Sequence, residues 1–360
     1  MGSTMNGIEN VPAEIVRRLL ERGHDVATRT AQMVGEFTEL RSVARKSLEG
    51  IIETIPDAIL DHVDMPDLSA VDGGMICESR SIGDFCSAVA VSAGTSADTG
   101  GCDIWMESVP RNPLNKEVLG GIMSSMEITL AHSIPSKLVM MDGAFLSTLI
   151  NVSKGIHSAR HRTRSALFDR GASIPSDSFR TAVMTILTES RFVAFPKYTT
   201  TNEFLDLLPP ELSVHDARTI ATMALRPGEM THFRIRPKSG GDNERRLIGP
   251  ALGFTKGNDR DFSAALDDIQ SCYYRPHPWT PAFRIDMTAS SADGEHAVGA
   301  LRAVRDTTRT SGIREPFPLY LADLFAKQVS IGSSPVVDMA ILSSITDPDA
   351  KLLLAMGYRS

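Results

Sequence analysis

The first part of the chain carries apolar residues at helical spacing. Ile15, Leu19 and Leu20 form one short stripe, and a second stripe follows within residues 34–43. Such stripes are typical of helices that bury one face. We therefore expect residues 11–62 to be helical, so that residues 1–62 form an N-terminal helical arm.

Beyond residue 62, short runs rich in Val, Ile and aromatic residues predict strands. The runs AVDGGMICES, FCSAVAVSAG and CDIWMESV predict an antiparallel meander. An apolar residue at every fourth position then predicts a helix over residues 115–133, and the almost wholly apolar run KLVMMDG predicts a strand buried on both faces. Three strands, a helix and another strand is the opening order of an RNase H-like fold.

The remaining pattern predicts further strands and several helices. Residues 144–190 are expected to be mainly helical insertions, RFVAFPK and PAFRID to be strands, and THFRIRPKSGGDNERRLIGPALGF to be a hairpin around Ser-Gly-Gly-Asp. Closing helices are expected over residues 294–310 and 318–330. We therefore expect an α/β protein with an RNase H-like mixed sheet flanked by helices, a domain at residues 63–335 and a C-terminal tail at residues 336–360.

Composition narrows the class of protein. The 360 residues carry a formal net charge of −7 and are 42% hydrophobic, which is typical of a globular protein and not of one that coats nucleic acid. We find no apolar run of roughly eighteen residues and no secretion signal, so we expect a cytoplasmic protein without a membrane segment. The four cysteines lack zinc-ligand spacing and are expected to be reduced and mostly buried.

Two aspartates stand beside glycines at the ends of predicted strands. Asp72 precedes Gly73 and Gly74, and Asp142 precedes Gly143. Asp-Gly is a common turn dipeptide, so either motif alone is also typical of a plain turn. If the two strands are neighbours, the carboxylates lie close together and repel one another unless a cation lies between them. The pair therefore predicts a divalent metal site, where each glycine lets the chain turn away.

A third acidic residue lies on the predicted helix at residues 115–133. Glu127 is at the border of the apolar face of that helix, which directly precedes the strand carrying Asp142. A glutamate in this position is also typical of a solvated helix surface. Beside two convergent aspartates, we expect its carboxylate to reach over the sheet and join them.

Six segments, taken in order, resemble the NurA nuclease family. AVDGG, SSMEITLAHS with Glu127, and LVMMDGAFLS with Asp142 are similar to the acidic core of that family. FVAFPKYTTTNEF, PAFRID and PFPLYLADLFAKQ are similar to its lysine-bearing strand, its late strand and its closing helix. The resemblance spans roughly residues 67–330 and is specific as a series.

The resemblance implies an RNase H-like nuclease that depends on Mn²⁺ or Mg²⁺ and cuts single strands and DNA ends. It also implies a homodimer and a partner, the hexameric ATPase HerA, in DNA end resection, repair or defence. By the same resemblance Asp72, Glu127 and Asp142 are metal ligands, and Lys197 contacts a phosphate or the attacking water. A lone lysine is also typical of a plain surface charge.

One position departs from the family pattern. Asp323 stands where the family typically presents a histidine, and it either ligates metal or pairs with Lys327 one helical turn away. Carboxylates suit hard cations, and two cations about 4 Å apart can activate water and offset the charge on the leaving 3′ oxygen. We therefore expect a two-metal site.

Two basic runs are candidate contacts to the DNA backbone, although each is also typical of a solvated surface. In the first run, Arg160 and Arg164 share a face if the run is helical. The residues of the second run, Arg234, Arg236 and Lys238, alternate along a predicted strand and so point one way. The candidates are Arg160, Arg162 and Arg164 in the first run, and Arg234, Arg236 and Lys238 in the second.

Two other functions remain open. An actin-like or sugar-kinase-like ATPase shares the topology and also places Asp-Gly-Gly after its first strand, but Met75 and Ile76 follow here in place of the expected threonine or serine. A noncatalytic adaptor that docks DNA or a motor ring is the second alternative. The complete acidic set argues against it.

Overall fold

The sheet is the central feature of the computed structural model, which describes residues 12–95, 100–160, 165–197, 203–235, 248–255, 259–292 and 294–347. Ten strands lie within these residues: β1 (Ile52–Thr54), β2 (Leu68–Arg80), β3 (Gly83–Gly94), β4 (Cys102–Val109), β5 (Leu138–Asp142), β6 (Phe192–Phe195), β7 (Glu229–Thr231), β8 (Arg234–Ile235), β9 (Ile269–Arg275) and β10 (Phe283–Thr288). Their order is β1-β7-β9-β10-β6-β5-β2-β3-β4, and β8 also pairs with β9.

One half of this sheet has the predicted RNase H-like arrangement. β2, β3 and β4 form the antiparallel meander, β5 lies parallel to β2, and β6 lies parallel to β5. The first four residues of β5 and all of β6 are buried, which explains their nearly continuous apolar sequence. The expected mixed α/β fold is confirmed.

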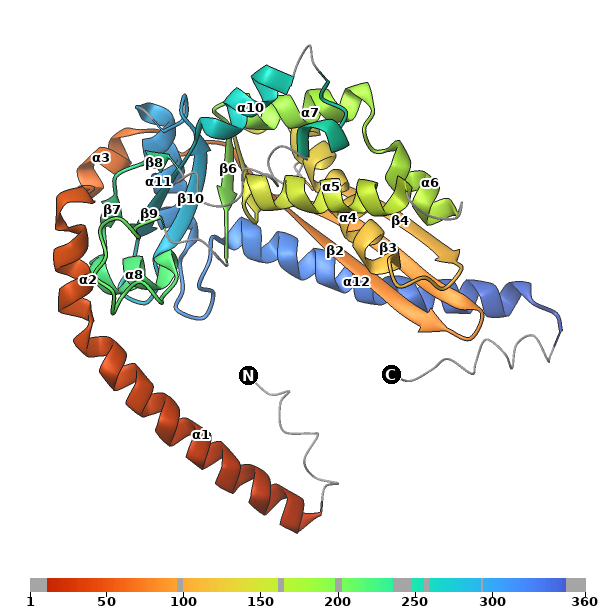
Figure 1. Ribbon diagram of the computed structural model, residues 1–360, viewed down its shortest axis with the longest axis horizontal. Helices are drawn as coiled ribbons and strands as arrows, with labels where there is room; N and C mark the ends of the chain where they lie inside the picture. The colour runs from red at the N-terminus through yellow and green to blue at the C-terminus, as the bar shows by residue number, and fades with distance from the viewer. Residues whose placement is uncertain are drawn as a thin grey trace.

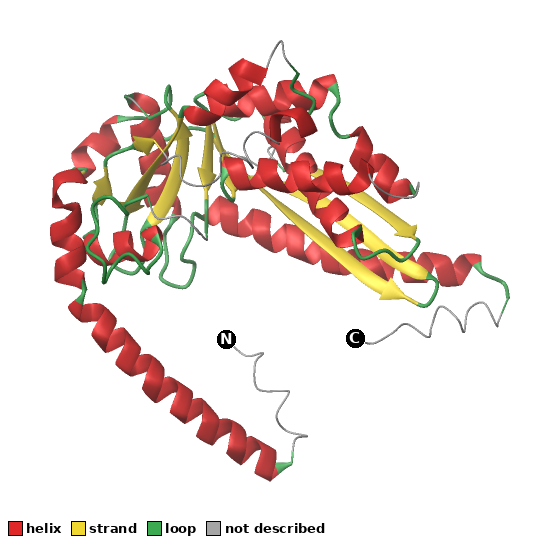
Figure 2. Ribbon diagram, viewed as in Figure 1, coloured by secondary structure: helices red, strands yellow, loops and turns green. Residues whose placement is uncertain are grey.

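Helices cover both faces of the sheet (Figures 1 and 2). One face packs against a core built from α4 (Asn115–Ser133), α5 (Phe145–Arg160), α6 (Ala166–Ser173), α7 (Asp177–Thr188) and α10 (Asp259–Asp267). The opposite face packs against α3 (Asp57–His62), α11 (Glu295–Thr307) and the first turns of α12 (Phe317–Ser344). Figure 1 shows α12 running along β2 and β3 on the side away from α4 and α5.

The second half of the sheet continues beyond β6 through antiparallel strands. A separate apolar cluster here joins α2 (Arg41–Leu48) and α8 (Ala217–Ala224) to Tyr273 of β9. The prediction of a wholly helical arm is wrong in one place: β1 pairs with β7 and so belongs to the sheet. Before it, α1 (Ala13–Glu39) projects away from the body, as Figure 1 shows.

Three other expectations need correction. β2 does not end at Asp72, because pairing with β3 continues from Ser69 to Arg80. Residues 248–251 are helical where the second arm of the hairpin was expected, and its turn lies outside the described residues. α12 crosses the expected boundary at residue 336, held to the end of β2 by the ion pair of Arg80 with Asp338 at 2.6 Å.

The cysteines are reduced, as expected, and no described helix combines the length and apolar composition needed to cross a bilayer. Cys86 and Cys272 are buried and Cys77 is partly buried, whereas Cys102 on the edge strand β4 is exposed.

The glycines after Asp72 allow close packing on both faces of β2. Successive residues of a strand face opposite sides. A methyl group at Gly73 would collide with the Glu127 side chain of α4, and one at Gly74 would lie 2.6 Å from the backbone oxygen of Ala326 in α12. The sequence suggested that these glycines turn the chain, and that prediction is wrong. They instead let α4 and α12 approach the strand.

We expect Gly74→Ala to lower the free energy of unfolding by about 1–3 kcal/mol, because α12 has to move away from β2. Chemical denaturation measures this change. Gly332→Ala, within α12, is the control. A methyl group at Gly332 meets nothing within 4 Å, so this substitution should be neutral or slightly stabilising. Equal stability of the Gly74 variant and the wild type would contradict the close contact.

Candidate metal centre

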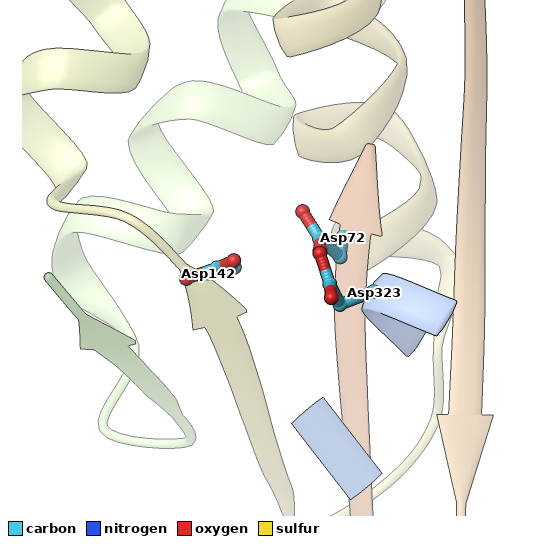
Figure 3. A group of neighbouring side chains, drawn as sticks. All are labelled: Asp72, Asp142 and Asp323. Atoms are coloured by element: carbon cyan, nitrogen blue, oxygen red, sulfur yellow. The ribbon is translucent and has the colours of Figure 1, made fainter. Parts of the chain in front are cut away.

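Three aspartates from three separate elements converge beside the sheet. Each of Asp72, Asp142 and Asp323 offers a carboxylate oxygen, and these oxygens all lie within 4.8 Å of one another. Figure 3 shows Asp72 within β2, Asp142 at the end of β5 and Asp323 on α12. Oxygen ligands of this kind suit hard divalent cations.

The sheet register explains why the first two aspartates meet. β2 and β5 are parallel neighbours with Val71 opposite Met141, so the residues that follow, Asp72 and Asp142, lie side by side. Gly143 then has φ +88°, a conformation that a residue with a Cβ rarely adopts, and it ends β5 directly after Asp142. The predicted adjacency of these two strands is confirmed.

Burial and like charge make ionisation of Asp72 unfavourable. This residue is only 7% exposed. Burial, together with the charges of Asp142 and Glu127, raises the pKa of its carboxyl to about 9. A cation among these groups would stabilise the charged form, so the donor set fits a divalent metal.

Glu127 approaches the same place from the opposite face of the sheet. It is 7% exposed, and its carboxylate lies against Gly73, where a side chain would collide with it. Burial and the charge of Asp142 raise the pKa of Glu127 to about 8. The described geometry therefore places Glu127 beside the three aspartates but not within their 4.8 Å group.

Lys197 lies just after β6 and is paired with two carboxylates. Its Nζ is 2.9 Å from Asp142 Oδ2 and 3.0 Å from Glu315 Oε2. Burial opposes its charge, but these two neighbours raise the pKa of the Lys197 ammonium above its ordinary value. Glu315 was not anticipated from sequence; its only sequence signal is its place directly before the proline-rich start of α12.

Asp323 makes both of the contacts that the sequence left open. It belongs to the group of three aspartates, and its Oδ2 accepts a hydrogen bond from Lys327 Nζ at 2.7 Å. Burial alone would raise the pKa of Asp323. Hydrogen bonds with Lys327 and Asp72 nevertheless hold this pKa below its usual value. The ion pair with Lys327 therefore does not remove Asp323 from the site.

Of the two predicted DNA contacts that the structure describes, Arg160 lies away from the aspartates. Arg160 ends α5, whose sixteen residues span roughly 24 Å from the end of β5. Arg234 forms an ion pair with Asp206 at 2.7 Å. The other four, Arg162, Arg164, Arg236 and Lys238, lie outside the described residues.

The surroundings of Gly73 and Gly74 differ from what the ATPase alternative needs. A glycine-rich phosphate loop offers open space beside its backbone. Here Glu127 fills the space beside Gly73, and the backbone of α12 fills the space beside Gly74. Phosphate therefore has no room at these two glycines.

Comparisons with known proteins agree with this architecture. A crystal structure of the NurA nuclease from Sulfolobus solfataricus superposes with a TM-score of 0.61 at 13% identity, covering 93% of this chain and 99% of that one. A structure of NurA bound to dAMP and manganese gives 0.58 at 11% identity, covering 92% and 99%. A further NurA structure gives 0.56 at 11% identity, covering 91% and 99%. At these identities the likeness establishes the fold.

The family follows from a match in sequence. A comparison with curated proteins finds no match. Residues 66–328, however, match the profile of the NurA domain, and they contain Asp72, Glu127, Asp142, Lys197 and Asp323. Because this match covers well over half of the chain, the protein belongs to the NurA family.

Proposed function

We propose that this protein is a divalent-metal-dependent deoxyribonuclease. The observation that carries the proposal is the convergence of Asp72, Asp142 and Asp323 within 4.8 Å, with Asp72 almost completely buried. Buried like charges at this separation destabilise the fold unless a cation or protons offset them. A NurA structure bound to manganese and dAMP supports the same class of ligand here.

The three aspartates would hold Mn²⁺ or Mg²⁺, with Glu127 completing the site from the other face of the sheet. A bound divalent cation, or a pair of them, supplies an activated water and offsets negative charge on the phosphate. The protein holds the carboxylates in place through β2, β5 and α12. Substrate would approach from the side of α12 and Lys197, where a cavity of about 320 Å³ is lined by both Asp323 and Lys197.

Lys197 would orient Asp142 and balance part of the negative charge. Its two ion pairs connect Asp142 to Glu315, which lies two residues before α12 begins at Phe317. When a phosphate enters, the same ammonium can contact it. Lys197 thereby joins the acidic group to the substrate side of the site.

DNA strands and DNA ends are the proposed substrates, and the resemblance to NurA nucleases also suggests a homodimer and the HerA ATPase as partner. Ile15, Leu19 and Leu20 of α1 are 48–70% exposed, and Ile331 and Met339 of α12 are 67% and 66% exposed. Apolar surface of this kind supports association with another chain. Arg160 remains a proposed contact to DNA outside the metal centre.

Asp72→Asn and Asp142→Asn should each reduce Mn²⁺-dependent cleavage of a labelled single strand on the order of 100-fold or more. A metal ligand contributes several kcal/mol to the barrier, whereas asparagine conserves the volume and leaves the fold intact. Gel analysis of the products measures the change. Asp103→Asn, on the exposed edge strand β4, is the matched control and should cleave at the wild-type rate.

Full cleavage by either site variant would contradict the assignment. ATP hydrolysis without DNA cleavage would favour the ATPase alternative, and DNA binding without either reaction would favour the adaptor.

Lys197→Met should lower the cleavage rate about 10-fold or more, because a hydrogen bond to a charged group contributes on the order of 1.5–3 kcal/mol. Lys197→Arg keeps the charge and should retain more activity than the methionine variant. Single-turnover rates at saturating Mn²⁺ measure both. Equal loss in the two variants would show that the charge of Lys197 is not what the reaction needs.

Metal-free protein should become less stable as pH rises from roughly 4 to 9. The pKa values of Asp72 and Glu127 are raised to about 9 and about 8, so in this range the folded state binds more protons than the unfolded state. Mn²⁺ displaces those protons, and it should therefore raise the melting temperature by about 3 °C more at pH 8 than at pH 6.

Calorimetric scans with EDTA or Mn²⁺ test this pH dependence. Asp72→Asn removes one of the two titrating groups and should flatten it. A Mn²⁺ shift of the same size at both pH values would contradict the role of these protons.

A further inference from the structure

A large cavity lies beside the metal centre, on the side of Lys197. Its volume is about 660 Å³, within the usual range for ligand sites, and its lining includes Lys197, Arg41, Arg218 and Arg275. We call it the arginine cavity. The smaller cavity that contains Asp323 is also lined by Lys197 and Arg218. The two cavities are therefore neighbours that share these two side chains, and they extend from Asp323 toward α2 and α8.

Positive charge dominates the arginine cavity. Among the described lining residues, Arg41 and Arg275 contribute two positive charges and Asp216 contributes one negative charge, so positive charge is in excess. Asp216 caps α8, where it accepts hydrogen bonds from the backbone nitrogen and the hydroxyl of Thr219 at 3.0 and 2.7 Å. This excess does not include Lys197, because its ammonium is paired with Asp142 and Glu315.

Neutral groups hold two of these arginines in place. Arg275 donates to four backbone oxygens, those of Thr222, Leu225, Pro278 and Thr280. Arg218 donates to the backbone oxygens of Lys197 and Ala282. Carbonyl oxygens orient a guanidinium but carry no net charge. The guanidinium of Arg275 is thus fixed in position by neutral partners, and together with Arg41 it offers its charge to an anion in the cavity.

Arg41 and Arg275 repel one another across this space. Burial and the neighbouring Arg41 lower the pKa of Arg275 below its ordinary value. Arg41 itself is exposed, and its Nε donates to the backbone oxygen of Met223 at 3.2 Å. An anion between two such guanidinium groups offsets their repulsion and accepts their remaining hydrogen bonds.

We propose that the arginine cavity binds backbone phosphates of a single DNA strand on one side of the bond that is cut. This inference rests on the proposed nuclease function and adds the path of the strand. The two neighbouring cavities place cationic groups in a series that ends at Asp323, one of the three aspartates. Both are concave spaces lined by side chains, and a flexible single strand can enter such a space more readily than a stiff duplex.

The lining also predicts the kind of recognition. The described residues that line the arginine cavity are cations, threonines, Asp216, Met223 and Pro281, and none of them offers an aromatic ring on which a base could stack. Contacts are then made to the backbone, which carries no sequence information. The cavity would therefore bind strands of different sequence with similar affinity.

Arg41→Gln is the decisive variant, because Arg41 is exposed and its replacement does not empty the core. The matched control is Arg309→Gln: Arg309 is also exposed and also donates Nε to one backbone oxygen, that of Asp306 at 2.8 Å, but it lines neither cavity. Arg41→Lys keeps the positive charge. Melting temperatures confirm that all three variants fold.

Binding of a fluorescent single strand of about 20 nucleotides is measured by anisotropy in EDTA, which stops metal-dependent cleavage, over a range of salt concentrations. Arg41→Gln should raise Kd about 5- to 10-fold at low salt. It should also reduce the slope of log K against log salt by about 0.7 for each phosphate that the variant no longer neutralises. Arg41→Lys should restore most of the slope, and Arg309→Gln should match the wild type.

Other results overturn the inference. If the wild-type protein cuts DNA with Mn²⁺ but Arg41→Gln binds with unchanged Kd and slope, the strand does not follow the arginine cavity and the nuclease function stands. Equal weakening in Arg41→Gln and Arg309→Gln also rejects the cavity. If the wild-type protein neither binds nor cuts DNA, the nuclease function and the cavity proposal fail together.

Discussion

The close approach of α12 to β2 is the contact on which the candidate metal centre depends. Gly74 leaves space for the backbone of Ala326, and the helix can therefore lie directly on the strand. Asp323 is three residues earlier on the same helix and meets Asp72, which faces the same side of β2 as Gly74. A larger residue at Gly74 would separate the two carboxylates as well as the two elements.

The same glycine pair brings acidic groups together from both layers of helices. Gly73 faces α4 and admits the Glu127 side chain, while Gly74 faces α12. Burial and the neighbouring carboxylates raise the pKa values of Asp72 and Glu127, and Lys197 balances the charge of Asp142 from the end of β6. The arrangement costs stability when metal is absent, and that cost is the reason why a cation would bind here.

The continuation of the sheet beyond β6 places a group of arginines near the candidate metal centre. β10, β9, β7 and β1 extend the RNase H-like half, and α2 and α8 pack on that extension. Arg41, Arg218 and Arg275 come from α2, α8 and β9, and they line one cavity that reaches Lys197. Carboxylates lie on one side and guanidinium groups on the other. This arrangement would suit a polyanion that places one phosphate at the candidate metal centre and the neighbouring phosphates against the arginines.

The hydrophobic pattern by itself determined the order of β2 to β6, the helix α4 and the neighbourhood of Asp72 and Asp142. Local composition is sufficient there, since burial on both faces leaves β5 continuously apolar and the meander strands are rich in Val, Ile and aromatic residues. The resemblance to NurA added Lys197 and Asp323. Sequence reasoning placed Asp72 at the end of a strand because Asp-Gly-Gly is a common turn signal.

Only the tertiary structure decided what the two glycines do, since close packing of α4 and α12 depends on distant parts of the chain. It also brought Glu315 to Lys197 and placed Glu127 on the opposite face of the sheet. The arginine cavity has no local signature at all: Arg41 and Arg275 are separated by most of the chain and meet only because α2 packs beside β9. Periodicity reports which residues share a face of one element, whereas long-range packing determines which faces meet.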